Sequence, residues 1–514
     1  MNPFLATDGY KTGHHKMYPK GTTLVYSNFT PRSAKHAPKG VEEVVVFGTQ
    51  LTVQQINKSF ATYFFTQPKE NVIAEIQAEY KMYLGADYDT KHIEALHDLG
   101  YLPIKVKALP EGTLAPMGVP VLTIVNTKPE FYWVTNFLET LLSNLLWKPM
   151  TSATIAHTYK KLLTKWALKT DPAAIGFVEF QGHDFSMRGM DSVDATMASG
   201  LGHATSFMGS DSLPVIHGAR HYYGEEGFVV GSVNATEHSV MCAGSKDDEI
   251  GTFRHLMDQF PTGILSIVSD TWDLWTVITK YLPELKEEIL ARDGKIVIRP
   301  DSGDPVDIIT GILDYTKLGG VEGFENDRKL RDGSPDPNYS PEAKGVIELL
   351  WDIFGGTTNE QGYKVLDPHI GAIYGDSITL DRAEAICERL EAKGFASTNV
   401  VLGIGSFTYQ FNTRDTFGFA MKATYVEING VGREIFKDPV TDDGAKKSAK
   451  GLLQVADDAD GNLTLHDQVT WKEEGLGALQ TIFEDGMFTN YTTLTEIRAK
   501  LQEVVTHGKQ THHV

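Results

Sequence analysis

Five short apolar runs between residues 175 and 410 each end abruptly in Gly, Asp, Ser or Arg, with helical patterns between them: Phe177–Phe180, Ile264–Val268, Lys295–Ile298, Ile370–Tyr374 and Val400–Leu402. Such runs are typical of strands buried on both faces of a parallel sheet, where a helix connects each strand to the next. The series predicts a parallel barrel of about 250 residues. A doubly wound open sheet is the alternative, and the barrel is favoured because no Gly-x-Gly-x-x-Gly motif opens the series.

The two ends of the chain show a different pattern. Ile104–Ala108 alternates as a half-exposed strand that Val121–Val125 would pair with, and alternation returns at Ala423–Ile428. Apolar residues at helical spacing predict helices near residues 49–65, 69–84, 89–98, 130–146 and 153–169. A last helix is expected over Leu494–Val505, with a capping box from Thr493 and Glu496.

These patterns give the expected fold class, which is α/β. It has a (β/α) barrel-like central domain plus an α+β domain with an antiparallel sheet built from both chain termini. The expected domains are residues 1–170 with 420–514 for the α+β domain, and 171–419 for the barrel, where residues 317–356 form an insertion. Within the insertion, Lys317–Tyr339 is rich in Gly, Asp, Asn and Pro and predicts a surface loop, followed by a helix over Glu342–Phe354.

Charge and cysteine content narrow the class of partner. The formal net charge of −20 argues against nucleic acid or an anionic membrane as the main partner, so a phosphate ligand would need a local basic cluster. The two cysteines, Cys242 and Cys387, lie far apart and have no metal-type spacing, which fits a reducing cytoplasm. We expect a cytoplasmic protein, because the chain opens without an export signal and has no apolar stretch of about 18 residues.

The stretch Lys295–Asp304 has the strongest chemical signature. Its apolar run leads into Arg299, the fixed turn of Pro300 and then Asp301. In a parallel barrel, side chains that follow a strand lie at the catalytic edge. A guanidinium there suits a phosphate, a carboxylate or a carboxamide oxygen, and a carboxylate beside it suits sugar hydroxyls or developing positive charge. An Arg–Asp pair that merely closes a loop is the simpler alternative.

Other strand ends carry residues suited to a phosphorylated sugar. Gly375 and the turn Gly403–Gly405 would let backbone N–H groups approach phosphate oxygens. Asp376 could hold ribose hydroxyls, and Asp273 could hold magnesium or its waters. Taken singly, glycines are needed in any turn, and each carboxylate is more often an ordinary cap or loop residue.

The segment Thr236–Ser239 places His238 next to a glutamate. Such a histidine could act in acid–base catalysis or accept a phosphoryl group, although a loop histidine is the simpler interpretation. The sequence has no Walker A, Gly-x-Ser-x-Gly or His-Glu-x-x-His motif. The last third of the chain concentrates basic residues that could form the local positive field for a diphosphate, or only a solvated face: Arg414, Lys422, Lys437, Lys446, Lys447 and Lys450.

Taken together, these stretches resemble the nicotinamide phosphoribosyltransferases, a family of type II phosphoribosyltransferases. The resemblance runs from Leu5–Lys11 to Phe436–Val440, and the motifs that carry it are His183-Asp184-Phe185 with Arg188-Gly189, Gly209-Ser210-Asp211, Glu237-His238-Ser239, Val268-Ser269-Asp270, Ile298–Gly303 and Gly375-Asp376. It implies a pentosyltransferase of NAD salvage. Such an enzyme makes nicotinamide mononucleotide and pyrophosphate from nicotinamide and phosphoribosyl pyrophosphate, with Mg²⁺. The resemblance also implies ATP hydrolysis coupled through a phosphohistidine, and a homodimer with its sites at the subunit interface.

The resemblance implies roles for the residues around the base and sugar. Phe185 and Tyr10 of the partner subunit would sandwich the pyridine ring, since two aromatic faces bind a flat heterocycle well. Asp211 would accept from the carboxamide N–H₂ group and repel the carboxylate of nicotinate. Arg299 and Ser269 would lie near the carboxamide. Asp301 would lie near the ribose and the ring nitrogen.

It implies further roles for residues that meet phosphate, metal and ATP. The 5′-phosphate would be held by Arg188, Gly375 and Gly405 or Ser406, and the ribose by Asp376. Asp273 would help to place Mg²⁺, and His238 would be the residue phosphorylated from ATP. Pyrophosphate or the phosphates of ATP would meet a set of basic residues: Arg32, Arg414, Lys422, Lys437 and Lys446.

Three positions depart from the family pattern. Ala420 stands where the family commonly has a serine near the phosphates, the turn Gly403–Phe407 replaces a longer glycine run, and the 317–356 insertion is longer than in animal members.

Two other functions remain as alternatives. One is nicotinate phosphoribosyltransferase, which Asp211 opposes because it would face another carboxylate. The other is a non-catalytic protein that binds nicotinamide or a phosphosugar.

Overall fold

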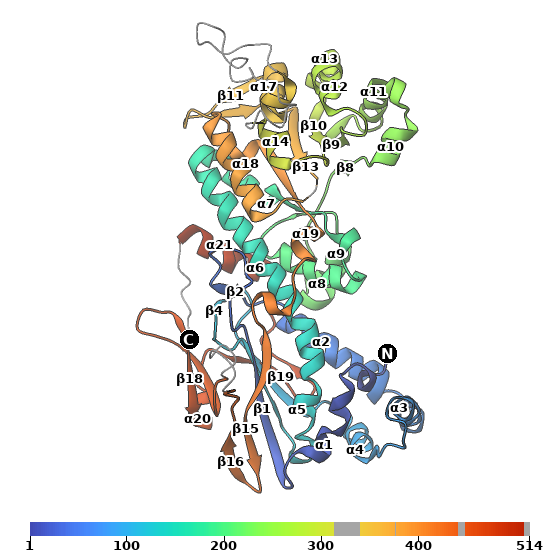
Figure 1. Ribbon diagram of the computed structural model, residues 1–514, viewed down its shortest axis with the longest axis vertical. Coiled ribbons are helices and arrows are strands. Elements are labelled where there is room, and N and C mark those ends of the chain that lie inside the picture. Colours follow the sequence, from blue (N-terminus) through green and yellow to red (C-terminus); the bar gives the residue numbers. More distant parts are fainter. Residues whose placement is uncertain (313–339, 376, 440–447, 508–514) are drawn as a thin grey trace.

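The computed structural model describes residues 1–312, 340–375, 377–439 and 448–507. A parallel sheet with the strand order β7-β6-β14-β13-β10-β9-β8 forms the central domain (Figure 1). Its strands are β6 (Gly182–Asp184), β7 (Gly209–Ser210), β8 (Asn234–Ala235), β9 (Thr262–Val268), β10 (Asp293–Arg299), β13 (Ile370–Tyr374) and β14 (Val400–Ile404). Every neighbouring pair is parallel, which confirms the expected parallel α/β domain.

The two edges of this sheet approach each other through one short segment. Gly231 forms a parallel bridge with Gly209 of β7, and three residues later β8 pairs with β9 at the other edge. The backbone N–H of Gly231 donates to Met208 O at 2.9 Å, and that of Ser210 donates to Gly231 O at 3.0 Å. The sheet therefore curls as a barrel does, and the barrel-like expectation is confirmed.

Helices cover the outside of the curled sheet and bury its apolar side chains. They are α8 (Val193–Ala204), α9 (Pro214–Tyr223), α11 (Glu249–Gln259), α13 (Leu282–Leu290), α14 (Pro305–Thr310), α17 (Val346–Phe354) and α18 (Leu380–Ala392). Strand residues such as Ile267, Ile298 and Leu402 are fully buried in one continuous core with side chains of α11, α13, α14, α17 and α18, while α8 and α9 pack in a separate cluster. This burial holds the strands in register and so fixes where their ends lie.

An antiparallel sheet forms the second domain from both ends of the chain, as expected. Its order is β16-β15-β1-β5-β3-β19-β20. The strands are β1 (Thr22–Thr30), β3 (Ile104–Ala108), β5 (Leu122–Asn126), β15 (Ala420–Ile428), β16 (Val431–Glu434), β19 (Gln480–Glu484) and β20 (Met487–Phe488). Two further antiparallel pairs accompany it, β2 (Glu43–Val45) with β4 (Leu114–Pro116) and the hairpin of β17 (Leu452–Asp457) with β18 (Leu463–Val469).

The helix α6 (Glu139–Thr170) links the two domains and differs from expectation. Separate helices over 130–146 and 153–169 were expected, but a single helix of 32 residues runs through Pro149, preceded by the short α5 (Val134–Phe137). Pro149 packs directly on Gly48, where an added Cβ would lie 2.5 Å from Pro149 Cγ. A proline inside a helix removes one backbone hydrogen bond, and the helix nevertheless continues past it. Figure 1 shows α6 crossing from the barrel into the sheet domain.

The run Phe177–Phe180 was wrong as a strand. Pro172 instead starts a helical turn over Pro172–Phe177, and α7 (Val178–Gln181) continues it up to the first residue of β6. The buried amide of Gln181 donates to Ser397 O at 2.7 Å and to Val400 O at 3.2 Å, which attaches this turn to the start of β14. A run of four residues is too short for periodicity to distinguish strand from helix.

The remaining helices agree with expectation. α2 (Thr49–Phe60) continues as a π-helical turn over Ala61–Phe65, and α3 (Lys69–Leu84) and α4 (Lys91–Leu99) follow. In α21 (Leu494–His507), Thr493 and Glu496 form the expected reciprocal cap. The helix expected over Glu342–Phe354 is divided at Gly345 into α16 (Pro341–Lys344) and α17. The loop expected over 317–339 lies outside the described residues.

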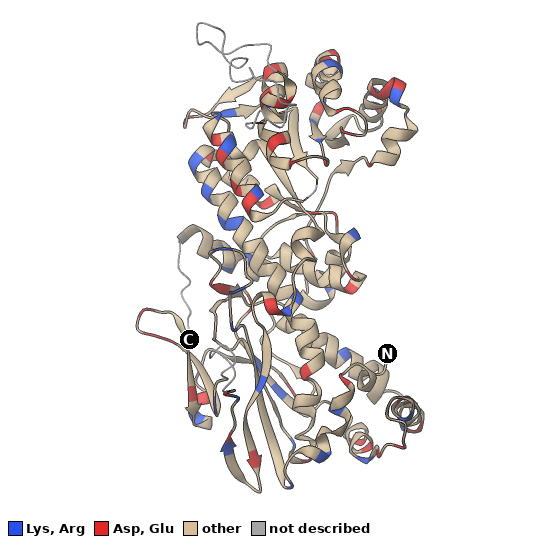
Figure 2. Ribbon diagram, viewed as in Figure 1, with Lys and Arg blue, Asp and Glu red and all other residues tan. Residues whose placement is uncertain are grey.

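Acidic and basic positions are mixed over both domains (Figure 2). None of the helices that the structure describes is long and apolar enough to cross a membrane.

Candidate active site

The residues that follow the parallel strands gather at one edge of the barrel. Because the strands all run in the same direction, their carboxyl ends meet there. The side chains at these ends are Phe185 after β6, Asp211 after β7, His238 after β8, Asp270 after β9, Arg299 and Asp301 at β10, Gly375 after β13 and Ser406 after β14. This edge is the candidate active site.

The aromatic ring of Phe185 is half-buried against the backbone of neighbouring strands. A Cβ on Gly403 would come within 2.9 Å of the Phe185 ring and 2.6 Å of Tyr374 O, so only glycine fits beneath this ring. The imidazole of His183 lies beside it, with ring centroids 4.5 Å apart and a tilt of 34°. The strand end therefore holds a flat apolar ring in a fixed position.

Asp211 is held as a carboxylate close to that ring. Its Oδ1 lies 3.1 Å from His183 Nε2, and its side chain is 41% exposed. Burial acts to raise the pKa of Asp211, but hydrogen bonds from His183 and Ser232, with the charge of Arg299, outweigh burial and lower it. Asp211 is therefore ionised at neutral pH and accepts hydrogen bonds without donating any.

Arg299 is the cation at the centre of the edge. It donates to Thr236 O, while its buried Nε has no acceptor among the described residues. Burial lowers the pKa of Arg299, and the nearby carboxylates of Asp301, Asp211 and Asp270 act in the opposite direction. A buried N–H without an acceptor is costly in a folded protein, so this atom is suited to meet an oxygen of a ligand.

His238 lies between two hydrogen-bonding partners at the same edge. Its Nε2 is 3.2 Å from Asp301 Oδ1 and its Nδ1 is 3.0 Å from Thr271 Oγ1. The side chain is 47% exposed. When Asp301 accepts from Nε2–H, the lone pair of the imidazole is on Nδ1, which makes that nitrogen the nucleophilic one.

Asp270 belongs to the edge although sequence reasoning gave it no role. Its Oδ2 accepts from the backbone N–H groups of Asp301 at 2.9 Å and Ser302 at 2.8 Å, and from the Ser302 hydroxyl. Its Oδ1 is buried without a partner among the described residues. Ligand atoms of His238, Asp270 and Asp301 all lie within 4.8 Å of one another. In the sequence, Asp270 follows an apolar run and one serine, and this position at a strand end could have identified it as a site residue.

Mg²⁺ prefers oxygen ligands and keeps several waters in its coordination shell. The unpartnered Oδ1 of Asp270 and the carboxylate of Asp301 fit that preference. Asp273, which the resemblance assigned to the metal, caps α12 (Leu274–Thr276). Its carboxylate accepts from Trp275 N at 3.0 Å, Thr276 N at 3.2 Å and Thr276 Oγ1 at 2.6 Å. Those bonds lower the pKa of Asp273, the bond from the Thr276 hydroxyl most of all, but they also occupy both oxygens.

The glycine turns and Arg188 form another side of the edge. A Cβ on Gly189 would overlap the Ser406 side chain, so the Arg188 turn packs directly on the start of α19 (Ser406–Tyr409). Arg188 is exposed and close enough to Arg299 for their charges to interact. Gly375 lies beside Asp301, whose Cβ would be 3.3 Å from an added Cβ. Asp376 lies outside the described residues.

Two expected residues occupy other positions. Ser269 is fully buried, and its hydroxyl donates to Ile267 O at 2.7 Å. Tyr10 is 62% exposed on a turn of the sheet domain (Gly9–Gly13), just before α1 (His14–Met17), and Figure 1 shows α1 far from β10 in the same chain. One chain therefore does not bring Tyr10 to its own Phe185.

Four of the expected basic residues form a cluster on the sheet domain. Burial lowers the pKa of Lys422; Glu139 acts to raise it, and Arg32, Lys437 and Arg414 lower it further through their charges. Arg32 is anchored by its Nε, which donates to Gly418 O at 2.9 Å. Lys446, the fifth expected member, lies outside the described residues. On a chain of net charge −20, this cluster is a local site of positive potential.

Comparison with known proteins adds a second line of evidence. Residues 180–487 match the model of the nicotinate phosphoribosyltransferase (NAPRTase) family, and residues 2–106 match the N-terminal domain of nicotinamide phosphoribosyltransferase. The chain is 50% identical to the nicotinamide phosphoribosyltransferase of Acinetobacter baylyi over 98% of this chain and 97% of that protein. It is 34% identical to the nicotinamide phosphoribosyltransferase of Mycoplasma pneumoniae over 88% of this chain and 97% of that protein. It is 31% identical to the Xanthomonas campestris protein of the same name over 97% of each chain.

Solved structures with the same fold are more distant in sequence. A nicotinate-nucleotide pyrophosphorylase from Pyrococcus furiosus superposes with a TM-score of 0.54 at 16% identity, covering 98% of this chain and 95% of its own. Human nicotinic acid phosphoribosyltransferase superposes with a TM-score of 0.52 at 16% identity, covering 97% of this chain and 93% of its own. At this identity they support the fold alone.

The pKa of Asp211 gives a direct test of the site's electrostatics. Replacing His183 with alanine removes a hydrogen bond that lowers this pKa and leaves burial, which raises it, so we expect the pKa of Asp211 to rise. Carbon-13 NMR titration of the carboxyl group measures it, with the resonance assigned from Asp211→Asn. The exposed His255→Ala variant is the control. An unchanged pKa in His183→Ala would show that His183 does not hold the carboxylate ionised.

Proposed function

Because the chain belongs to the nicotinamide phosphoribosyltransferase family, we propose that its strand-end site transfers the phosphoribosyl group of phosphoribosyl pyrophosphate to nicotinamide. The products are nicotinamide mononucleotide and pyrophosphate, and the reaction is a step of NAD salvage. The observation that carries this proposal is the convergence of Phe185, Asp211, Arg299 and Asp301 at one edge of the barrel.

The base is recognised by its flat ring and its neutral carboxamide. The ring of Phe185 stacks on the pyridine. Asp211 accepts from the carboxamide N–H₂ group, and the unpartnered Nε of Arg299 is available to donate to the carboxamide oxygen. Nicotinate would bring a second carboxylate against the ionised Asp211, and this repulsion selects the amide.

The chemical step needs no covalent enzyme intermediate. The bond between C1 of the ribose and the pyrophosphate oxygen breaks with its electron pair leaving on pyrophosphate. The ring nitrogen of nicotinamide then donates its lone pair to C1. Asp301 lies among the carboxylates of the edge, where negative charge stabilises the oxocarbenium-like sugar. Phe185 and Asp211 orient the nitrogen for attack.

The phosphates of the donor require positive charge and backbone N–H groups. Arg188, Gly405 and Ser406 hold the 5′-phosphate beside Gly375, and Asp376 binds the ribose hydroxyls. Asp270 and Asp301 would hold Mg²⁺, which neutralises pyrophosphate oxygens when bound. Arg32, Arg414, Lys422 and Lys437, together with Lys446, bind pyrophosphate or the phosphates of ATP.

A homodimer completes the site. Tyr10 and the basic cluster both lie on the sheet domain, while Phe185 lies on the barrel. Tyr10 is 62% exposed, so its ring is free to cover the base bound to a second copy of the chain. Two aromatic faces, one from each subunit, then enclose the pyridine.

His238 couples ATP hydrolysis to synthesis by accepting a phosphoryl group. The contact between Nε2 and Asp301 leaves Nδ1 as the nucleophile, at an exposed position beside the Thr271 hydroxyl. In this step the Nδ1 lone pair attacks the γ-phosphorus of ATP, the bond to the β-phosphate oxygen breaks, and ADP leaves. Water later hydrolyses the phosphohistidine.

The substrate preference is tested by turnover of nicotinamide and of nicotinate with phosphoribosyl pyrophosphate and Mg²⁺. Wild-type protein should form nicotinamide mononucleotide and release pyrophosphate. Asp211→Asn should lower kcat/KM for nicotinamide by roughly tenfold or more, the value of one hydrogen bond to a charged group. It should also raise the ratio of kcat/KM for nicotinate to kcat/KM for nicotinamide by about tenfold. An unchanged ratio would remove Asp211 from base selection, and absence of turnover by the wild type would overturn the proposed reaction.

ATP coupling is tested by the ratio of the synthetic rates with and without ATP. In His238→Ala this ratio should fall to about one, because the variant has no phosphoryl acceptor, and acid-labile phosphate on the protein should disappear. The exposed His255→Ala variant, which keeps His238, should retain the wild-type ratio. Continued stimulation by ATP in His238→Ala would exclude this histidine as the acceptor.

The shared site is tested by mixing two inactive variants. Tyr10→Ala and Phe185→Ala should each lose at least about tenfold in kcat/KM, since each removes one aromatic face. In a mixture, random exchange makes half of the dimers mixed, and each mixed dimer has one of its two sites intact, so activity should recover to about a quarter of wild type. If the mixture stays as inactive as its components, Tyr10 does not act across the interface.

A further inference from the structure

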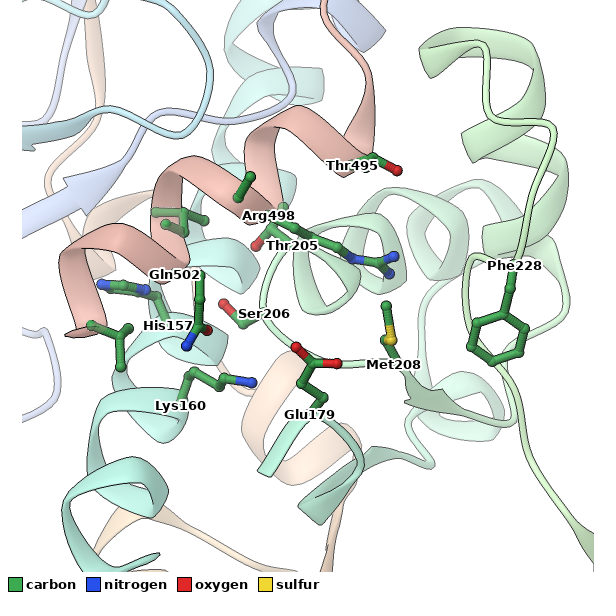
Figure 3. Close-up of a pocket in the computed structure, with 13 residues that line it drawn as sticks. His157, Lys160, Glu179, Thr205, Ser206, Met208, Phe228, Thr495, Arg498 and Gln502 are labelled. Atoms are coloured by element: carbon green, nitrogen blue, oxygen red, sulfur yellow. The ribbon is translucent and has the colours of Figure 1, made fainter. Parts of the chain in front are cut away.

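A second polar cavity lies behind two of the strands that form the active site. It has a volume of about 250 Å³ and lies between α6, α7 and α21 (Figure 3). Glu179 precedes β6 and Met208 precedes β7, and Met208 N donates to Glu179 O at 2.7 Å. The cavity is thus at the amino-terminal ends of these strands, whereas Phe185 and Asp211 follow their carboxyl ends. The proposed reaction uses none of its residues.

Two cations enter this cavity from different helices, Lys160 buried and Arg498 half-buried. Lys160 of α6 is 4% exposed, and Arg498 comes from α21, as Figure 3 shows. Arg498 is fixed by Nε, which donates to Ala204 O at 2.5 Å, and by Nη2, which donates to Val229 O at 2.6 Å. Its Nη1 remains for another acceptor. Within the described chain, neither cation has a carboxylate within 4.0 Å. Lys160 Nζ forms no hydrogen bond there, and it lies over the Phe207 ring, 5.6 Å from the ring centroid.

The charges around these cations do not cancel. Burial lowers the pKa of Lys160 to about 8 and that of Arg498 to about 10, so both remain mostly protonated near pH 7. Glu179 is the carboxylate among the residues that line the cavity, and it acts on both cations from beyond ion-pair distance, as Glu225 does on Arg498. The lining therefore has more positive than negative charge.

Neutral polar atoms in the lining also lack partners. His157 is 5% exposed, and neither of its ring nitrogens has a hydrogen-bonding partner among the described residues. The buried hydroxyl oxygen of Ser206 likewise has no hydrogen-bonding partner among the described residues. Burial lowers the pKa of His157 to about 4, so the ring is neutral and offers one donor. Buried polar atoms normally have partners, so several unpartnered atoms around one cavity indicate a ligand with many acceptors.

We propose that this cavity is a second anion site, which binds a phosphate group through Lys160, Arg498, His157 and Ser206. Phosphate offers acceptor oxygens in several directions, which suits donors arriving from α6, α21 and the loop after α8. Its negative charge offsets the charges of Lys160 and Arg498, which water alone cannot do. The volume is below the range of drug-sized pockets and accommodates free phosphate or a compact phosphomonoester.

Calorimetric titration of the full chain with inorganic phosphate tests the site. Wild-type protein should bind phosphate in the cavity in addition to the proposed 5′-phosphate site and the basic cluster. Lys160→Met should lose only the cavity site, with its Kd rising about tenfold or more, while Lys422→Met should keep the cavity site and lose the site at the basic cluster. Lys58→Met removes one exposed positive charge from α2 and should bind phosphate as wild type does. Phosphate binding by Lys160→Met with wild-type stoichiometry and Kd would overturn the proposal.

Thermal unfolding separates binding from folding. Without phosphate, Lys160→Met should unfold at the wild-type temperature or above it, because the variant no longer buries a poorly compensated charge. Phosphate should raise the Tm of wild type and Lys58→Met more than that of Lys160→Met. His157→Phe, which keeps an aromatic ring but has no hydrogen-bonding nitrogen, should weaken phosphate binding several-fold. If neither variant changes the effect of phosphate on Tm, the cavity is not a phosphate site.

Acetate is the second probe, because it shares the oxyanion but lacks the tetrahedral set of acceptors. Weaker binding of acetate than of phosphate, lost in Lys160→Met, supports a site built for phosphate. Acetate binding equal to that of phosphate would overturn the choice of phosphate as the ligand. Because Lys422→Met reports on the active-site cluster and Lys160→Met on the cavity, failure of one assignment leaves the other intact.

Discussion

The whole molecule depends on the common direction of seven parallel strands. Their buried side chains fix the register of the sheet, and the register fixes the positions of the side chains that follow each strand. Residues more than 200 positions apart in sequence, such as Phe185 and Gly403, are thereby in contact. No single strand carries the site, so its geometry is a property of the sheet rather than of any local motif.

The electrostatics of the edge follow from one half-buried guanidinium placed among several carboxylates. Arg299 would be unfavourable in this position alone, and Asp211, Asp270 and Asp301 would repel one another without it. The combination keeps Asp211 ionised. Among the residues that the structure describes, Arg299 Nε and Asp270 Oδ1 are buried at this edge without a hydrogen-bonding partner, so a substrate and a cation can satisfy them.

Sequence patterns predicted the elements whose signal is local. The runs that became β9, β10, β13 and β14, the helices α2 to α4 and the cap of α21 all have unambiguous periodicity or capping. The pairing of His183 with Asp211, the role of Asp270 and the space beneath Phe185 depend on neighbours distant in sequence and had no local signal. Phe177–Phe180 was too short to assign, and α6 continues through Pro149, where a proline normally kinks or breaks a helix. The hairpin of β17 and β18 was not predicted, although Asp460-Gly461 between the two strands is a hairpin-turn signal.

The continuous helix α6 ties the dimensions of the two domains together. Leu142, Leu146 and Met150 belong to the core of the sheet domain, while Ile155, Tyr159 and Leu163 belong to that of the barrel. An α-helix turns by about 100° and advances about 1.5 Å for each residue. One residue inserted or deleted between these two groups would swing one domain around the helix axis relative to the other. The length of α6 is therefore constrained by both domains, whereas the length of a surface loop is not. A change in the length of α6 during evolution would require changes in the packing of both cores.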